Sequence, residues 1–207
     1  MKHEWKKHEK KIYLPKNKPE LVTIPGFKFF SIEGVGNPNT SAEFSEGIGV
    51  LYALSYGIKM MPKKGITPPG YFEYTVYPLE GIWDLTEEGR TADTFDKNQL
   101  VYKIMIRQPD FVTDDLAQQV IETVKQKKPH NLLSKVKFEV IEDGLSVQML
   151  HIGSYDDEPK SFELMKAFCR ENSLRREDLR HREIYISDPQ KTSPEKLKTV
   201  LRYFVKN

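Results

Sequence analysis

Three stretches of the chain repeat apolar residues at the spacing of an amphipathic helix. They cover 41–57, 114–127 and 158–172. Ser41 and Thr113 stand just before the first two, in the position where a hydroxyl side chain caps a helix N-terminus. The pattern therefore predicts three helices, each with an apolar face directed at a core.

Runs of apolar residues rich in β-branched and aromatic types predict strands between these helices. The predicted strands are 21–33, 71–77, 82–85, 100–107, 136–141, 145–153, 181–187 and 203–205. Glu142-Asp143-Gly144 joins two of them as a hairpin turn. The polar stretch 86–98 is expected to be a loop, and Pro194 to begin a short helix.

The order of the predicted elements repeats along the chain. The segments 21–107 and 145–206 both run strand, turn, helix, loop, strand and final strand, with a helical insert at 113–128 between them. Residues 1–20 form a basic arm whose apolar residues predict docking on the body. The sequence thus predicts one α+β domain over 21–207, built from two pseudo-symmetric βαββ modules. Its antiparallel sheet would carry helices on one face and leave the other as a cleft for a small ligand.

Composition and charge narrow the class of protein. The chain has 207 residues, of which 38% are hydrophobic and 30% charged, and its formal net charge is only +2. Its scattered lysines and arginines argue against a nucleic-acid partner. The single cysteine, Cys169, cannot form an internal disulfide, and neither a signal peptide nor a long apolar run is visible. We therefore expect a cytoplasmic protein with no membrane partner.

The predicted strand 181–187 holds the strongest candidate for chemistry. Alternation places His181, Glu183 and Tyr185 on one face and Ile184 on the other. If Ile184 faces the core, Glu183 faces the cleft, where a carboxylate is costly to desolvate and is kept only with partners. Such a group suits general acid or base work. A solvated Glu paired with a nearby Lys or Arg fits the pattern equally well.

Aromatic residues near the strands supply candidate walls for a ligand site. Trp83 stands at a strand bend, where it is either a core residue or a stacking surface. Tyr155 follows the strand 145–153 and is either a loop residue without a role or the rim of a pocket.

The motifs of several common enzyme classes are missing from the sequence. The five histidines are dispersed without metal-binding spacing, and neither a nucleophile elbow nor a Gly-rich phosphate loop occurs. The sequence accordingly predicts no metal and no cofactor.

Four stretches resemble the GyrI-like small-molecule-binding family. They are 5–15, 51–56, 77–83 and, above all, 181–189 followed by 194–198. The resemblance covers nearly the whole chain and implies a fold of paired βαββ modules. This fold is similar to the effector-binding domains of multidrug-responsive transcription activators, in which a buried Glu among rings receives cationic or flat aromatic ligands.

Because no helix-turn-helix domain is present, the chain is similar to the stand-alone branch, which includes cyclopropanoid cyclopropyl hydrolases. These enzymes detoxify DNA-alkylating compounds by adding water across a strained cyclopropane. The resemblance maps their key carboxylate to Glu183 and the ligand-binding rings to Tyr71, Trp83, Tyr155 and Tyr185. It implies a hydrolase whose ligand is a flat aromatic or cationic small molecule. A non-catalytic module that sequesters or senses a drug or metabolite is the alternative, and the oligomeric state is left open. Inhibition of a protein such as gyrase through an acidic face finds little support in the near-neutral charge.

Overall fold

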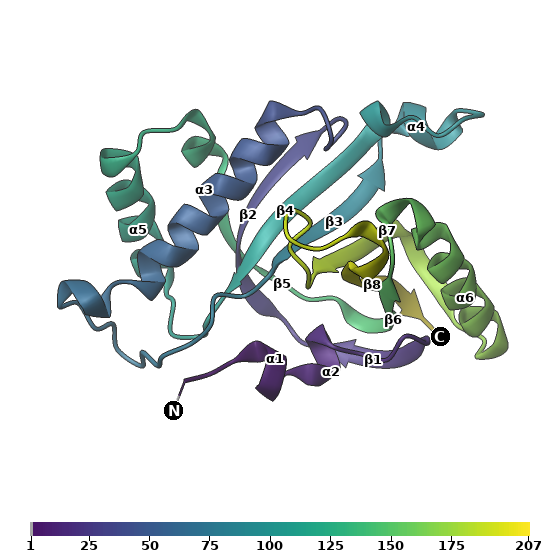
Figure 1. Ribbon diagram of the computed structural model, residues 1–207, viewed down its shortest axis with the longest axis horizontal. Coiled ribbons are helices and arrows are strands. Elements are labelled where there is room, and N and C mark those ends of the chain that lie inside the picture. The colour runs from purple at the N-terminus through teal and green to yellow at the C-terminus, as the bar shows by residue number, and fades with distance from the viewer. Residues whose placement is uncertain (1) are drawn as a thin grey trace. The chain divides into compact units, whose positions relative to one another are not determined.

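The computed structural model describes residues 2–207, which gather into two compact units (Figure 1). The first unit contains 2–4, Phe27–Leu79 and Asp84–Ile141, and the second contains Trp5–Gly26, Glu80–Trp83 and Glu142–Asn207. Both combine antiparallel strands with helices, so the predicted α+β class is confirmed. The predicted βαββ order also recurs along the chain, once between Phe27 and Gln108 and once between Gly144 and Lys206.

In the first unit β2 (Phe27–Val35) is the central strand. It pairs antiparallel with β4 (Leu100–Gln108) on one side and with β5 (Lys137–Ile141) on the other. The helix α3 (Ala42–Lys59) crosses β2 and β4, and α5 (Asp114–Lys127) packs against α3 (Figure 1). The apolar faces of both helices therefore meet neighbours within the unit, as their sequence periodicity requires.

Hydroxyl caps begin the helices of the first unit. The side-chain oxygens of Ser41 and Thr113 accept hydrogen bonds from backbone N–H groups three residues later, as predicted. Thr86 caps α4 (Glu87–Thr91) in the same way, so the expectation that 86–98 would be only a loop is wrong. The remaining short helices of this unit are η1 (Pro62–Lys64), η2 (Lys97–Gln99) and η3 (Asn131–Lys135).

The predicted strand 71–77 does not form. This segment makes one isolated bridge, in which Tyr74 lies beside His3 and the backbone of His3 exchanges hydrogen bonds with Glu73 and Thr75. The flanking prolines, at 68, 69 and 78, cannot donate to a ladder, so the alternation of residues does not extend into paired strands.

The second unit is built on a sheet in the order β1-β6-β8-β7, with the middle of β3 beside β7 and every pair antiparallel. The strands are β1 (Glu20–Ile24), β3 (Leu79–Leu85), β6 (Gly144–Ile152), β7 (Arg175–Tyr185) and β8 (Lys198–Lys206). Because β8 is hydrogen-bonded on both sides, it is longer than the predicted 203–205. β7 begins before 181 and passes an irregularity between Arg176 and His181.

Both faces of the second unit's sheet are covered. On one face, Met165 and Cys169 of α6 (Glu158–Glu171) pack against Leu201 and Tyr203. On the other lies the N-terminal arm with α1 (Trp5–His8) and α2 (Lys10–Tyr13), whose carbonyl groups accept side-chain hydrogen bonds from the sheet. The arm therefore belongs to the packed body of this unit.

The register decides which face carries Glu183. Glu183 lies opposite Leu201, so it shares the face on which α6 packs. The expectation that Glu183 would point away from the helices is therefore wrong. It came from treating the Ile184 face as the helix-covered one, whereas that face meets the arm.

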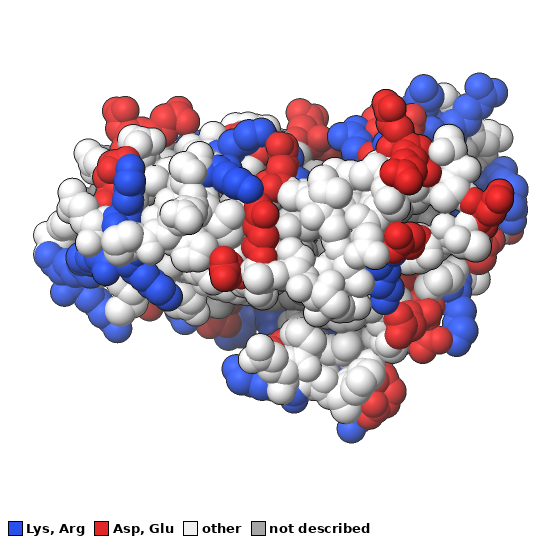
Figure 2. All heavy atoms as spheres, turned by 90° about the horizontal axis from the view of Figure 1, so that it is seen from above, with Lys and Arg blue, Asp and Glu red and all other residues white. Residues whose placement is uncertain are grey.

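Within the described residues no helix has the length and apolar character needed to cross a bilayer. On the face seen in Figure 2, acidic and basic side chains are interspersed rather than gathered by sign.

Candidate functional site

Glu183 lies in the middle of the second unit's sheet. Its strand, β7, runs between β3 and β8, and its direct neighbours across the two ladders are Gly81 and Leu201. The residue is only 9% exposed. A carboxylate at such a position needs hydrogen-bond partners, because the surrounding strands offer it little water.

Three side chains on the same face form a hydrogen-bonded row with Glu183. The hydroxyl of Tyr185 donates to Oε2 of Glu183 over 2.7 Å, and Nε2 of His181 lies 3.0 Å from Oε1. The indole N–H of Trp83 donates to the Tyr185 hydroxyl over 2.9 Å. The period of the strand thus aligns the groups of β7, and its antiparallel pairing with β3 adds the indole.

Gly81 makes room for this row. A Cβ atom at position 81 would lie 2.8 Å from Nε1 of Trp83 and 3.4 Å from the Tyr185 hydroxyl. Any side chain here would push the indole away from its hydrogen bond. The glycine is therefore required by close approach rather than by a turn.

A second carboxyl group, that of Glu158, meets Glu183. Glu158 is the first residue of α6, is buried, and shares a hydrogen bond with Glu183. Burial, followed by the charge of Glu183 and that hydrogen bond, raises the pKa of Glu158 to about 10. At neutral pH Glu158 therefore keeps its proton. Its Oε1 has no hydrogen-bond partner.

The start of α6 is anchored so that Glu158 stays in place. His151 of β6 binds on both sides of this start, with Nδ1 2.9 Å from Oγ of Ser161 and Nε2 3.0 Å from the carbonyl oxygen of Ser154. Between them, the turn η4 (Tyr155–Asp157) is capped by the side chain of Ser154. The sheet thus fixes the helix end that presents the second carboxyl group.

Aromatic rings border the carboxyl pair. Tyr155 meets Tyr185 edge to face, with ring centroids 6.0 Å apart, and Phe162 packs on His181 at 4.9 Å. Burial, then the charges of Glu158 and Glu183, raises the pKa of Tyr155 to about 12. Burial and Glu183 also hold the pKa of Tyr185 well above its ordinary value. Both phenols therefore stay protonated and able to donate.

The structure brings together four of the five residues that sequence analysis singled out. Trp83, Tyr155, Glu183 and Tyr185 lie in the second unit within this constellation. Tyr71 lies in the first unit, where its ring packs on Phe111 with centroids 5.2 Å apart. Tyr155 is 38% exposed and so lies at the edge of the group.

Sequence reasoning missed Glu158 and the contact of His181 with Glu183. Glu158 follows Asp156 and Asp157 and precedes Pro159, a pattern that is typical of a solvated helix N-terminus. Nothing in that pattern distinguishes a buried acid from its exposed neighbours. For His181 a signal was present, because it shares strand parity with Glu183.

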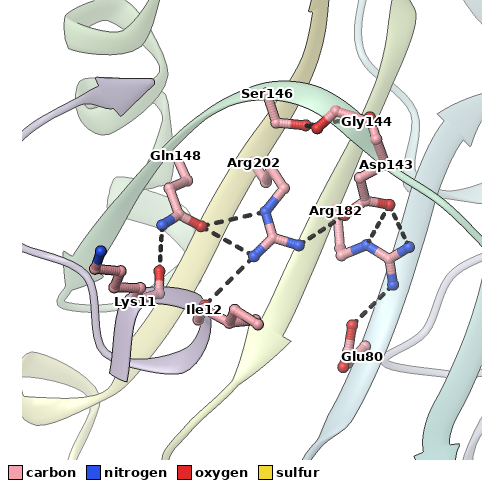
Figure 3. A network of polar contacts seen from close by, with 9 residues as sticks. All are labelled: Lys11, Ile12, Glu80, Asp143, Gly144, Ser146, Gln148, Arg182 and Arg202. Carbon is pink, nitrogen blue, oxygen red and sulfur yellow. Dashed lines mark hydrogen bonds and ion pairs between the residues drawn. The ribbon is translucent and has the colours of Figure 1, made fainter. Parts of the chain in front are cut away.

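On the opposite face of the same strands, charged groups form a closed network (Figure 3). Asp143 accepts from Arg182 through Oδ1 and from Arg202 through Oδ2, and Arg182 also donates to Glu80. Burial opposes ionisation of Asp143, but the two guanidinium groups outweigh it and lower the pKa of its carboxyl group. Arg202 and Gln148 extend the network to the arm, through the carbonyl oxygens of Ile12 and Lys11. This network fixes β7 on the face opposite Glu183.

No cluster of three or more potential metal-ligating side chains occurs among residues 2–207. The atoms that the site presents are the carboxyl oxygens, the phenolic hydroxyls and the imidazole described above.

Comparison with known families and structures shows which family has this architecture. The chain matches the GyrI-like small molecule binding domain over residues 17–205, and it belongs to that family. Small-molecule binding is therefore its broad function.

Solved structures agree with this assignment. A hydrolase from Listeria innocua is 35% identical, with a TM-score of 0.88 over 99% of this chain and 100% of the other. An uncharacterized conserved protein from Listeria innocua is 37% identical, with a TM-score of 0.91 and the same coverage. The C-terminal domain of EcmrR shares the fold at 14% identity, with a TM-score of 0.53 over 92% of this chain and 98% of that domain. A search of curated proteins found no significant match.

Proposed function

We propose that the protein hydrolyses flat aromatic compounds that carry a strained cyclopropane, with Glu183 as general base. The observation that carries the proposal is a buried carboxylate bonded to Tyr185 and His181 beside Trp83. The Listeria innocua protein described as a hydrolase, at 35% identity, supports hydrolysis as the reaction class.

The proposed step adds water across one carbon–carbon bond of the cyclopropane. Glu183 removes a proton from water as the oxygen bonds to the ring carbon. The broken bond's electron pair moves into the conjugated ring system and creates a phenolate, which takes up one proton. Glu158 holds a proton within the same carboxyl pair, so the pair can return the proton that Glu183 accepts. General-base help of this kind is worth about 10²–10⁴-fold in rate.

In this proposal the rings hold the flat substrate. Trp83 and Tyr185 are fixed by their mutual hydrogen bond, whereas Tyr155 is partly exposed at the edge of the group. Tyr71 is retained as a proposed ligand contact from the family resemblance alone.

The test compares Glu183→Gln with the parent protein on a cyclopropane-bearing alkylating agent. Mass spectrometry of the ring-opened product should show a loss of about 10²-fold or more in turnover for the variant. Glu163→Gln is the matched control, because Glu163 is an exposed residue of α6 paired with Lys166. Equal turnover by parent and Glu183→Gln would exclude the general-base role.

A second candidate function is cation binding without chemistry. Burial raises the pKa of Glu158 to about 10, so Glu158 is neutral at neutral pH and the carboxylate of Glu183 is the group that would attract a cation among the rings. Titration calorimetry should then show that Glu183→Gln weakens a flat aromatic cation by tenfold or more and leaves a neutral analogue unchanged. Glu158→Gln should retain the cation, because it replaces a neutral group. Equal cation affinity of parent and Glu183→Gln would rule this function out.

A further inference from the structure

The second unit carries a hollow on the sheet face opposite Glu183. Its volume is about 590 Å³. Lys198 lines it from β8, opposite Ile152 and beside Ile186. Its two further lysines are Lys6 of α1 and Lys196 of η5 (Pro194–Lys196). We call this site the basic hollow.

Backbone hydrogen bonds fix the walls of the basic hollow. The N–H of Gly153 donates to the carbonyl of Leu197, and the N–H of Leu150 donates to that of Lys16, which ties the arm to β6. The hydroxyl of Ser187, which also lines the hollow, accepts from the N–H of Lys198 over 3.1 Å. The hollow is therefore preformed, so a ligand would not need to order its walls.

The charge of the basic hollow is positive and uncompensated. No acidic side chain lines it, and among the described residues none of its three lysines forms an ion pair with a carboxylate. Some exposed lysines of this unit are neutralised by a carboxylate, as Lys160 is by Asp157 and Lys191 by Asp188. The ammonium group of Lys6 lies over the ring of Trp5, 5.1 Å from its centroid, and this contact leaves its charge in place. Three ammonium groups without a carboxylate partner around one concavity attract an anion.

The remaining lining is apolar. Leu14, Ile152 and Ile186 contribute aliphatic side chains, and Ile152 is 49% exposed. An inorganic anion would leave these side chains in water, whereas a ligand with an apolar body would cover them. The volume suits a small organic molecule.

We propose that the basic hollow binds a free organic anion with an apolar body, such as a medium-chain or aromatic carboxylate. The carboxylate would lie among the ammonium groups of Lys6, Lys196 and Lys198. The body would lie on Leu14, Ile152 and Ile186. This site is separate from Glu183 and does not depend on the function proposed for it.

The test uses octanoate as the probe, with acetate and octyltrimethylammonium as matched ligands that lack the body or reverse the charge. Titration followed by amide chemical shifts should show saturable binding of octanoate, with shifts at Ile152, Ser187 and Lys198. Acetate should bind at least tenfold more weakly, and the cation should cause no shifts there. Equal binding of acetate, or of the cation at the same residues, would overturn the proposal.

Two variants sharpen the assignment. Each of Lys196→Gln and Lys198→Gln should weaken octanoate about two- to fivefold, the range expected for one exposed charge pair. Lys206→Gln, at the other end of β8, should leave it unchanged. Glu183→Gln should also bind octanoate like the parent, which separates this site from the carboxyl pair.

Sedimentation with anionic lipid vesicles should show no binding of the protein. Preferential binding to vesicles would mean that the ligand is a membrane surface rather than a free anion, and would overturn the proposal.

Discussion

The two faces of the second unit's sheet both bury carboxyl groups, but they partner them differently. Behind β7, Asp143 uses both oxygens to accept from guanidinium groups, and Glu80 accepts from Arg182. On the α6 face, Glu183 is bonded to Tyr185 and His181, and no lysine or arginine among the described residues forms an ion pair with it. Glu158 beside it leaves Oε1 without a partner.

The difference separates a structural network from a site that can receive a ligand. Where charges already neutralise one another, a ligand gains nothing by entering, and the network joins strands to the arm. Where a buried carboxyl oxygen has no hydrogen-bond partner, as in Glu158, a donor group on a ligand can still bind it and lower the free energy of the complex.

The largest effect on stability is expected from the charged network on the sheet face opposite α6. Asp143→Ala would leave Arg182 and Arg202 buried beside an empty position, which should cost about 3–5 kcal/mol of unfolding free energy. Urea unfolding measures the loss. Asp178→Ala is the control, because Asp178 pairs with Arg180 near the surface and should cost at most about 1 kcal/mol. Similar losses in the two variants would mean that the network does not stabilise the fold as inferred.

Glu158→Gln should remove a pH dependence of stability. In the unfolded chain the pKa of Glu158 is about 4.3, whereas in the folded protein it is about 10. Between these values the unfolded state binds fewer protons, so the parent loses stability as pH rises, by up to about 1.4 kcal/mol per pH unit.

Unfolding of both proteins at about pH 5 and about pH 8 checks this linkage. The variant should gain stability relative to the parent as pH increases. A constant difference across the range would show that Glu158 does not keep its proton in the folded state.

Periodicity in the sequence predicted much of the fold. The helix at 114–127 and the sharing of one strand face by His181, Glu183 and Tyr185 follow from spacing alone, because both depend on neighbours close in the chain. The strand predicted from spacing at 71–77 was wrong, because flanking prolines limit the pairing of this segment to a single bridge.

The partners of buried charges could not be predicted in this way. Arg182 meets Asp143 from 39 residues away, and Arg202 meets it from 59. From the sequence alone, each of these residues looks like a solvated position of a strand or turn until the register of three strands is known. Glu158 could not be identified for the same reason, because its burial depends on where the first turn of α6 meets β7.

A moderate loss of stability is expected from Gly81→Ala. The added Cβ atom would overlap Nε1 of Trp83, so the indole should shift from the Tyr185 hydroxyl at a cost of about 1–3 kcal/mol. Trp83 fluorescence, recorded in a Trp5→Phe background, should change with it. Gly49→Ala is the control, because its Cβ would meet no atom within 4 Å and should stabilise α3 by about 0.5–1 kcal/mol. An unchanged Trp83 spectrum in Gly81→Ala would contradict the close approach.

The smallest effect on stability should come from the hydroxyl that links Trp83 to Glu183. Tyr185→Phe removes one acceptor and one donor, so it should cost about 1 kcal/mol of unfolding free energy. Tyr155→Phe keeps the edge-to-face contact of the rings and should stay within about 0.5 kcal/mol of the parent. Turnover or ligand affinity should separate the two variants further, since only Tyr185 hydrogen-bonds Glu183 directly. If both variants matched the parent in stability and in ligand binding, the hydrogen bonds of the row on the α6 face would contribute no more to function than the packing of its aromatic rings.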